Sequence, residues 1–289
     1  MGKQYVVMEI KMENNEIKYP NTLSVIILNY KNIDLTAKCV NYLMESVEKA
    51  KIATEIIVID NSAPLTANQL KKILPSNIKI IENEVNQGFS RANNQGIKIC
   101  TGQYILLLNN DAFVNPECLW GGLDYLMENI DVGIWAPKLM GEDGSMQVSC
   151  AQLPSFKGLI GEYLLFRNLD WYIDVYNWTE PHEVGTVVGA YLLLKKSVID
   201  QVGLLDEDFF FSVEDVDYCK RVHKAGFKVV FDPRFKVLHI GSASSEDSWI
   251  SSQHLHNYRV LYFHKHHGKL SSWAAWLIIK LGLIVRRVH

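Results

Sequence analysis

Short runs of apolar, β-branched residues alternate along this chain with longer stretches whose apolar residues recur at helical spacing. The run LSVIIL at 23–28 is nearly continuous, which is typical of a strand buried on both faces. The stretch 34–50 then carries an apolar residue every four positions from Leu35 to Val47, on one face of a helix. The alternation continues with predicted strands at 55–60, 78–81, 103–109 and 132–137, and predicted helices at 66–74, 89–99 and 116–128. Such spacing indicates βαβ units, so we predict an α/β protein with a Rossmann-like, mostly parallel central sheet flanked by helices.

The alternation stops after residue 137. Gly, Ser, Pro and aromatic residues dominate 141–182, where we expect a long, partly ordered segment. Beyond it the patterns predict strands at 184–195, 227–232 and 235–240, helices at 197–202 and 214–225, and two helices within 249–289. We therefore divide the chain into an N-terminal extension (1–22), a main domain (23–245, with halves 23–137 and 138–245) and a helical, basic C-terminal tail (246–289).

Charge is distributed unevenly over the 289 residues. The net charge of −3 creates no basic field that would attract nucleic acid. From Ser248 to the C-terminus, however, there is no carboxylate side chain, while six Lys or Arg and six of the nine His residues fall there. An acidic body with a basic tail suggests that the tail meets something anionic. We expect the tail histidines to be solvated or interfacial.

The cysteines and the N-terminus both favour a cytoplasmic protein. The five cysteines are scattered and form no CxxC pair, so each is predicted to be a reduced packing residue and not a zinc ligand. The first twenty residues lack a long apolar core and a small-residue cleavage site, which argues against a secretory signal.

Polar residues follow three of the predicted strands. They are Asn29-Tyr30, Asp60-Asn61-Ser62 and Asn109-Asn110-Asp111. Carboxyl ends of parallel strands lie at one edge of a sheet, which is where open α/β sheets bind ligands. The alternative is that these residues are ordinary turn formers, but three clusters in register favour a binding site.

Glycine-rich phosphate motifs are missing from the sequence. There is neither GxGxxG nor GxxxxGK[ST], and the glycine-containing segment is Asn86-Gln87-Gly88-Phe89 with Arg91 and Asn94 after it. A bound phosphate would then be neutralised by a divalent cation held by a carboxylate, and Asp111 is the candidate. His239, at the end of the last predicted strand, is a candidate second ligand. The alternatives are a loop acid and a structural histidine.

A second cluster lies at the start of a predicted helix. Three phenylalanines, 209–211, precede Glu214, Asp215 and Asp217. Carboxylates in the first helical turn are stabilised by the helix dipole, and we interpret Asp217 in this way, paired with Arg221. An ionised carboxylate beside an apolar pocket suits a general base, and Asp215 is the candidate.

The chain resembles family 2 glycosyltransferases of the GT-A fold, and most closely a bacterial rhamnosyltransferase-like branch. The matching stretches are VIILNYK (25–31), IIVIDNS (56–62), ENEVNQGFSRANNQGI (82–97), ILLLNNDAFV (105–114), the segment from Gly189 to Val229, and VLHIGSAS (237–244). They follow the family's order and spacing over most of the chain. The resemblance makes 23–245 a GT-A catalytic domain, with nucleotide-sugar-binding (23–137) and acceptor or catalytic (138–245) halves.

The resemblance also implies residue roles. Asp60 would accept a hydrogen bond from the pyrimidine N3–H, and Asp111 and His239 would hold Mg²⁺ or Mn²⁺. Asp215 would be the base, with Gly189, Ala190 and Glu214 near the sugar and acceptor. The other donor-binding residues would be Asn29, Tyr30, Asn61, Asn86, Gly88, Phe89, Arg91, Asn94, Asn109 and Asn110. Asn109 departs from the family's metal-binding DxD-like motif, in which its position is an aspartate.

These roles predict an inverting, metal-dependent glycosyltransferase. The donor expected first is dTDP-L-rhamnose, with a UDP-sugar as the alternative, and the acceptor is a saccharide or a polyprenyl-linked saccharide of cell-surface polysaccharide synthesis. Asn109 alone favours a catalytically inactive sugar-nucleotide-binding or scaffold protein. A nucleotidyltransferase is disfavoured because 25–35 contains no Gly and only Lys31 as a basic residue.

The tail ends in the apolar run WAAWLIIKLGLIV at 273–285. It is shorter than the ~20 apolar residues that span a bilayer, and Lys280 interrupts it. The tryptophans, with Arg286 and Arg287, favour attachment to an anionic membrane surface on its cytoplasmic face. The alternative is a helix docked on the catalytic domain or on a second subunit of a homo-oligomer.

Overall fold

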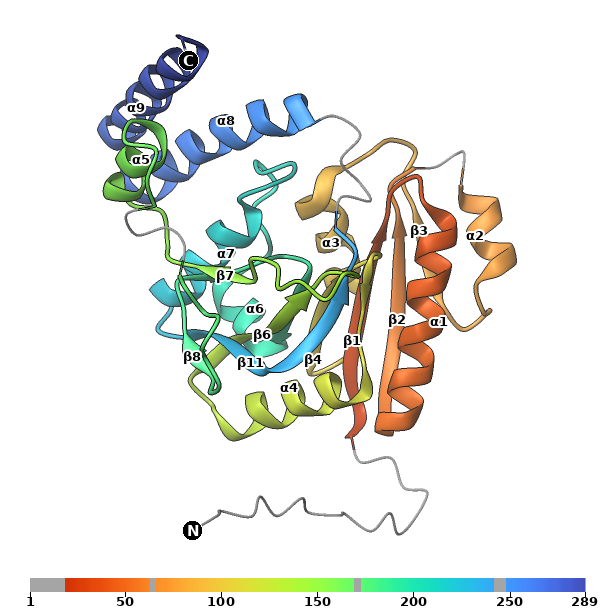
Figure 1. The fold of residues 1–289 in the computed structure, drawn as a ribbon. Coiled ribbons are helices and arrows are strands. Elements are labelled where there is room, and N and C mark those ends of the chain that lie inside the picture. The colour runs from red at the N-terminus through yellow and green to blue at the C-terminus, as the bar shows by residue number, and fades with distance from the viewer. Residues whose placement is uncertain (1–18, 63–65, 169–172, 242–247, 289) are drawn as a thin grey trace, which may run out of the picture.

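A computed structural model describes residues 19–62, 66–168, 173–241 and 248–288 (Figure 1). Most of the N-terminal extension and the junction between the catalytic domain and the tail lie outside these residues. The helices are α1 (Ile33–Ala50), α2 (Ala67–Ile73), α3 (Gly88–Ile99), α4 (Pro116–Glu128), α5 (Phe156–Tyr163), α6 (Lys196–Val202), α7 (Glu214–Lys224), α8 (Ser248–His267) and α9 (Lys269–Val288). The strands are β1 (Tyr19–Asn29), β2 (Ile52–Asp60), β3 (Lys79–Glu82), β4 (Tyr104–Asn109), β5 (Ala112–Phe113), β6 (Val132–Met140), β7 (Cys150–Ala151), β8 (His182–Glu183), β9 (Thr186–Val187), β10 (Tyr191–Lys195) and β11 (Lys228–His239).

The main sheet runs in the order β3-β2-β1-β4-β10-β6-β11-β5, with β8 also paired to β11. β1 pairs in parallel with β2 and β4, and β6 pairs in parallel with β11. This confirms the predicted mostly parallel sheet. In the centre of the sheet, β10 is the exception, because it lies between β4 and β6 and is antiparallel to both.

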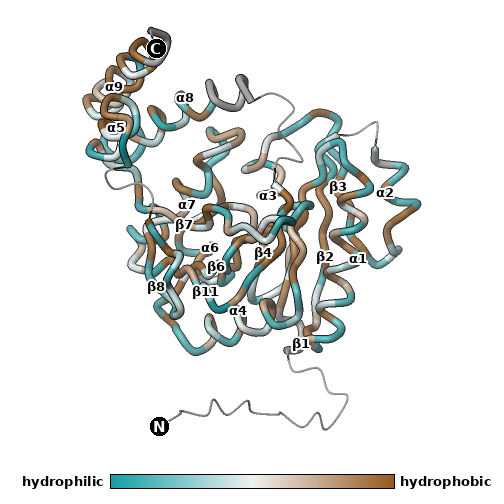
Figure 2. Tube along the Cα trace, viewed as in Figure 1, coloured by the Kyte–Doolittle hydropathy of each residue, from teal (hydrophilic) through white to brown (hydrophobic). Residues whose placement is uncertain are grey.

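Strand residues alternate between two buried cores. Val25 and Ile27 of β1 pack toward α1 and α4, while Ile26 packs toward α3 on the other face. The buried stretches of β1, β2 and β4 are accordingly apolar (Figure 2), as expected when helices cover both faces of a sheet. All five cysteines are buried and free, as predicted.

The boundaries of several elements differ from the sequence prediction. β1 begins at Tyr19, inside the proposed extension. The strand predicted at 184–195 is broken into β9 and β10, which leaves Gly189 and Ala190 between them. The strands predicted at 227–232 and 235–240 are one strand, β11, whose register shifts between Asp232 and Lys236. Pro233 explains the shift, because proline cannot donate a hydrogen bond to the ladder.

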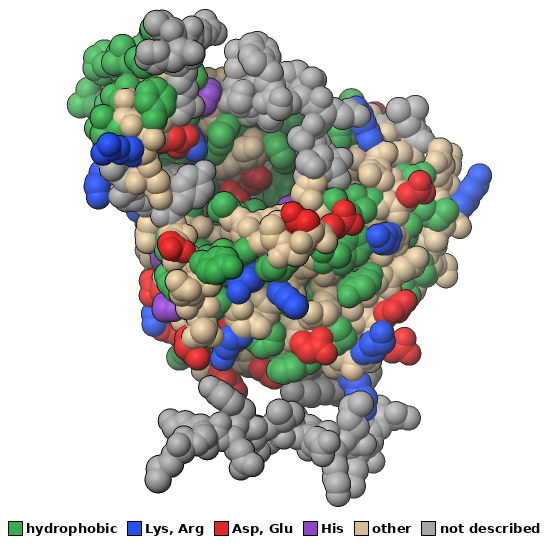
Figure 3. Space-filling view, viewed as in Figure 1, with side chains coloured by type: hydrophobic (Ala, Val, Ile, Leu, Met, Phe, Trp, Pro, Cys, Tyr) green, Lys and Arg blue, Asp and Glu red, His purple; other side chains and the backbone are tan. Residues whose placement is uncertain are grey.

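The segment 141–182 contains α5, the helix on which the C-terminal tail packs. Its helix α5 packs against α9, and a Cβ at Gly282 of α9 would meet the backbone oxygen of Tyr163 in α5, so the helices cross closely. The opposite face of α9 is apolar and exposed, and Figure 3 shows hydrophobic side chains gathered at that end of the molecule. This face consists of Leu270, Trp273, Trp276, Leu277, Leu281 and Ile284. Within the part of the chain that the structure describes, no helix is long and apolar enough to cross a membrane.

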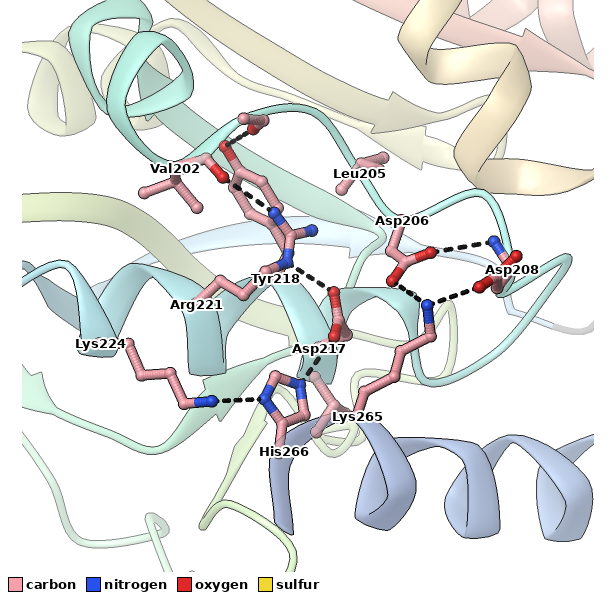
Figure 4. Close-up of polar contacts among 12 residues, drawn as sticks. Val202, Leu205, Asp206, Asp208, Asp217, Tyr218, Arg221, Lys224, Lys265 and His266 are labelled. Carbon is pink, nitrogen blue, oxygen red and sulfur yellow. Dashed lines mark hydrogen bonds and ion pairs between the residues drawn. The ribbon is translucent and has the colours of Figure 1, made fainter. Parts of the chain in front are cut away.

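Side-chain hydrogen bonds and ion pairs hold the C-terminal end of α8 against α7 and the loop that precedes α7 (Figure 4). His266 Nε2 lies 2.7 Å from Asp217 Oδ1, and Arg221 Nε donates to Asp217 Oδ2 at 2.8 Å. Lys265 reaches Asp206 and Asp208 in the loop, at 2.6 Å each. Asp217 is therefore paired with Arg221, as predicted, but also with a tail histidine whose acidic partner the sequence analysis did not find.

We predict that Asp217 is a structural residue whose contribution to stability depends on pH. Burial alone would raise the pKa of Asp217, but the hydrogen bond from His266 and the contacts of Arg221 outweigh it and lower that pKa. A carboxylate with a lowered folded-state pKa stabilises the protein above its unfolded pKa, about 3.9, and that stabilisation is lost as the pH falls through the folded value. Asp217→Asn should therefore cost about 1.5–3 kcal/mol in urea unfolding at pH 7.

The matched control is Asp208→Asn, because Asp208 also contacts Lys265 but its side chain is 69% exposed. That variant should change the free energy of unfolding by less than about 1 kcal/mol. The difference between wild type and Asp217→Asn should shrink as the pH is lowered below about 4. A difference that stays constant over this range would contradict the assignment.

Candidate active site

A buried hydrogen-bond network joins the carboxyl ends of β1, β2 and β4. Asn29 and Asp60 are register partners on β1 and β2, and Asn29 Nδ2 donates to Asp60 Oδ1 at 2.9 Å. Thr36 Oγ1, on α1, donates to Asn29 Oδ1 at 2.7 Å, and Asn110 Nδ2 donates to Thr36 Oγ1 at 2.9 Å. The three predicted polar clusters therefore lie together, linked by a threonine that the sequence analysis did not single out.

Asp60 is fully buried within this network. Its Oδ1 accepts hydrogen bonds from the Ser62 backbone and hydroxyl at 3.1 and 2.8 Å. The Thr66 hydroxyl lies 2.8 Å from Oδ1 and 2.7 Å from Oδ2, yet its single hydrogen can serve only one of them. Oδ2 is thus the less committed oxygen among the described contacts, and a ligand N–H would find its acceptor there. Tyr30, next to Asn29, is half-buried at the same edge.

Asn61 and Asn86 build the loop that leads into α3. Asn61 Nδ2 donates to Asn86 Oδ1 at 3.0 Å and to the Gly88 carbonyl at 3.1 Å. Gly88 has a φ of +74°, and a Cβ there would collide with the Phe210 carbonyl. The Phe89 N–H donates to that same carbonyl at 2.7 Å. Gly88 therefore lets the loop lie directly on the phenylalanine run before α7.

Arg91 and Asn94, both expected at the donor, hold a loop in place. Asn94 is buried, and its amide bonds the Leu205 backbone in both directions, at 2.9 and 3.0 Å. Arg91 Nε donates to Glu207 Oε2 at 2.9 Å. Their observed contacts are therefore with residues 205–207, the start of the loop that carries the phenylalanines.

Asp111 and His239 face each other because β5 pairs with β11. Ala112 is the register partner of His239, and the Ile240 N–H donates to the Asp111 carbonyl at 3.0 Å. His239 Nε2 then lies 3.4 Å from Asp111 Oδ1, with both side chains largely buried. Among the described residues, no group of three or more His, Cys, Asp and Glu side chains is placed to hold a metal ion. A cation at this pair would thus have two protein ligands and take its others from a ligand or water.

Two residues in the left-handed region precede α7. Ser212 and Val213 have φ values of 75° and 73°, which is unusual for side chains with a Cβ and above all for a β-branched one. Such strain persists where surrounding contacts enforce it, and it is common at functional sites. It turns the chain so that Glu214 and Asp215 form the first turn of α7.

Glu214 and Asp215 have different environments although they are neighbours. Asp215 Oδ2 accepts from the Gly189 N–H at 2.9 Å and Oδ1 accepts from the Val216 N–H at 2.8 Å. Burial raises the pKa of Asp215, and these two hydrogen bonds oppose the increase. Burial and then the charge of Asp215 raise the pKa of Glu214 well above its usual value, and nothing among the described residues hydrogen-bonds its Oε2. Asp215 is therefore the better stabilised carboxylate of the pair, and the raised pKa of Glu214 favours its protonated form.

A cleft of about 360 Å³ lies in front of these acids. Its walls bring together Asn109 at the end of β4, Gly189 and Ala190 between β9 and β10, and Asp215 on α7. Leu255 and Arg259 close it from α8, and Figure 3 shows this hollow beneath α8 with acidic side chains inside. An ionised carboxylate in a cleft that is partly closed to water can accept a proton from a bound hydroxyl group.

Sequence comparison identifies a family. The model of glycosyl transferase family 2 matches residues 24–203. An N-acetylglucosaminyl-diphospho-decaprenol L-rhamnosyltransferase of Mycobacterium tuberculosis is 34% identical over 137 residues, 43% of this chain and 45% of that protein. A poly-beta-1,6-N-acetyl-D-glucosamine synthase of Staphylococcus aureus is 29% identical over 194 residues, 67% of this chain and 43% of that protein. The matches thus cover less than half the length of both relatives.

Solved structures share the fold. A mannosyltransferase from Pyrobaculum calidifontis, in complex with GDP-Man and Mn²⁺, aligns with 94% of this chain and 77% of its own, with a TM-score of 0.59 at 15% identity. S. aureus TarS 1-349 aligns with 91% of this chain and 70% of its own, with a TM-score of 0.54 at 15% identity. These likenesses confirm the predicted GT-A architecture.

Proposed function

The chain belongs to glycosyl transferase family 2, and on this basis we propose that it transfers a sugar from a nucleoside-diphosphate sugar to a saccharide hydroxyl group with inversion at the anomeric carbon. The observation that carries the proposal is the cleft that Asp215, held by the Gly189 N–H, lines together with Asn109 at the end of β4. In the reaction, the acceptor oxygen bonds to the anomeric carbon, the bond from that carbon to the diphosphate breaks, and the acceptor proton moves to Asp215.

On the donor side, we propose that the nucleotide base lies at the edge formed by Asn29, Tyr30 and Asp60. Asp60 Oδ2 would accept the base N–H, because Thr66 is its only described donor and a carboxylate oxygen can accept more than one hydrogen bond. Thr66 can also direct its hydroxyl to Ser62 Oγ, which lies 2.9 Å from Thr66 Oγ1. The loop of Asn86, Gly88 and Phe89 would lie beside the donor.

The donor diphosphate would lie at Asp111 and His239. A carboxylate oxygen and an imidazole nitrogen 3.4 Å apart are a suitable pair of ligands for Mg²⁺ or Mn²⁺. When bound there, the cation would neutralise charge on the leaving diphosphate. Asn109 replaces the usual acid of this motif, but its backbone N–H donates to the Ala190 carbonyl at 3.1 Å, so it joins β4 to the acceptor side of the cleft.

We infer dTDP-L-rhamnose as the donor to test first, since a rhamnosyltransferase is among the relatives. The named products of the relatives support a role in cell-surface polysaccharide synthesis, with a saccharide or a polyprenyl-linked saccharide as acceptor. A UDP-sugar is the alternative donor.

We predict that Asp215→Asn lowers turnover by about 10²-fold or more, because the variant has lost the proton acceptor. Glu214→Gln is the matched comparison. Because burial and the charge of Asp215 raise the pKa of Glu214 and so favour its protonated form, the neutral amide of similar shape is a conservative replacement. It should lower turnover far less. Steady-state transfer assays with both variants decide this, with circular dichroism to confirm folding. Equal losses in the two variants would contradict the assignment of the base.

We predict that a pyrimidine nucleotide sugar raises the melting temperature only when Mn²⁺ or Mg²⁺ is present. Binding to the native state alone adds about 2.7 kcal/mol of stability at a ligand concentration one hundred times Kd. A thermal-shift panel should compare dTDP-L-rhamnose with UDP-sugars. His239→Ala should abolish the metal-dependent part of the shift, whereas His264→Ala, an exposed tail residue, should preserve it. Full shifts and full turnover in excess EDTA would refute metal dependence, and ligand binding with no transfer would favour the inactive scaffold.

The exposed face of α9 supports attachment to an anionic membrane surface, which we propose is the cytoplasmic one. Ala275 and Ile279 are buried against α5 and α8, while Trp273, Trp276 and Leu277 face outward. Membrane attachment and docking on protein, which the sequence presented as alternatives, are compatible in this helix, because one face of α9 packs on the protein and the other is exposed. Lys280 lies exposed on the outward face, where its stem can reach along apolar surface and its charge can reach lipid phosphates.

We predict that the protein floats with liposomes containing anionic lipid at low salt. Trp273→Glu combined with Trp276→Glu should abolish flotation, because both charges would enter the membrane interface. Ile130→Glu is the control, since Ile130 is 84% exposed in the turn after α4, away from the tail. A wild-type protein that remains unbound, or a double variant that floats equally well, would rule out this surface.

A further inference from the structure

Gln147 lies beside His239 in a turn outside the sequence stretches that carry the family resemblance. The turn follows β6, and the Gln147 N–H donates to the Leu139 carbonyl at 2.9 Å. Met140 and Met146 form a bridge across the turn, which fixes the backbone next to Gln147. The side chain of Gln147 thus starts from a defined position against the end of β11.

The Gln147 amide makes two contacts with one residue. Its Nε2 donates to the His239 backbone carbonyl at 2.8 Å, and its Oε1 lies 2.6 Å from His239 Nδ1. The first contact assigns the nitrogen and the oxygen of the Gln147 amide, because only the NH₂ group can donate a hydrogen bond to a carbonyl. The oxygen therefore faces Nδ1 and must receive a hydrogen from it.

The proton on His239 is then held at Nδ1. In a neutral imidazole with a hydrogen on Nδ1, Nε2 carries the lone pair. That nitrogen is the one 3.4 Å from Asp111 Oδ1. Two electron-rich atoms so close, and largely buried, form a favourable arrangement when a cation lies between them.

We propose that Gln147 is a positioning residue for a divalent cation: it fixes the tautomer and the orientation of His239 so that Nε2 is presented to the metal beside Asp111. The inference rests on the proposed metal site. Partners of this kind change metal affinity by about 10- to 100-fold when they are removed.

The test measures Mn²⁺ binding by the loss of the free-ion EPR signal in the presence of dTDP. Gln147→Leu keeps the side-chain volume but removes both contacts, and Kd for Mn²⁺ should rise about 10- to 100-fold. Gln147→Glu can still accept from Nδ1–H, so it should retain most of the affinity that Gln147→Leu loses. Gln201→Leu is the matched control, because Gln201 is exposed on α6, and its Kd should equal that of wild type.

A double-mutant cycle separates this role from a general packing role. In the His239→Ala background, Gln147→Leu should have no further effect on Mn²⁺ binding, because Gln147 acts through His239. Wild-type affinity in Gln147→Leu would overturn the inference, and so would an equal loss in both backgrounds. If His239→Ala itself binds Mn²⁺ like wild type, the proposed metal site is wrong and the inference falls with it.

A second readout needs no Mn²⁺. Long-range ¹H–¹⁵N NMR of the histidine rings, with His239→Ala to assign the signal, reports which nitrogen carries the hydrogen. Wild type should show the Nδ1–H form at about pH 8, above the usual pKa of histidine of about 6.5, and Gln147→Leu should lose this preference. An Nε2–H form in wild type would overturn the proposal even if His239 does bind metal.

Discussion

The parallel pairing of β1 with β2 and β4 is the constraint on which the candidate site depends. In register, Asn29 lies opposite Asp60 and Leu28 opposite Asn109, so three polar strand ends meet at one edge. Burying them is favourable only because each finds a partner, and the chain of bonds from Asp60 to Asn110 supplies those partners. A one-residue slip in either pairing would reverse the faces of the strand and disconnect this chain.

The three acids in the first turn of α7 show how local environment divides one charge cluster into different roles. Glu214 is buried with no hydrogen-bond partner for Oε2 among the described residues, and its raised pKa favours the protonated form. Asp215 has two backbone N–H donors, which makes ionisation possible in the cleft. Asp217 is paired with Arg221 on α7 and with His266 on α8, which lower its pKa. It is therefore ionised and joins α7 to α8.

The tail connects two surfaces of opposite character. Toward the body, Lys265 pairs with Asp206 and Asp208 in the loop before α7, and His266 contacts Asp217 of α7, so part of the basic character of the tail is used in holding it to the body. Outward, α9 exposes tryptophan and leucine side chains. α9 packs against α8, and α8 lines the cleft through Leu255 and Arg259. A membrane bound to the outer face of α9 would therefore be connected to the candidate site through α8.

Local patterns along the sequence determined the alternating strands and helices, the edge at which the polar clusters meet, and the Asp217–Arg221 pair. These depend on contacts a few residues apart or on the burial of whole strands, and such signals are present in the residue order. Only the tertiary structure decided that β10 enters the sheet antiparallel, that β11 runs through Pro233, and that α5 lies in the segment 141–182. It also decided that Thr36, Gln147 and His266 reach Asn29, His239 and Asp217. The partners of Gln147 and His266 are 92 and 49 positions away, and no periodicity records a hydrogen bond that forms only when separate elements pack together.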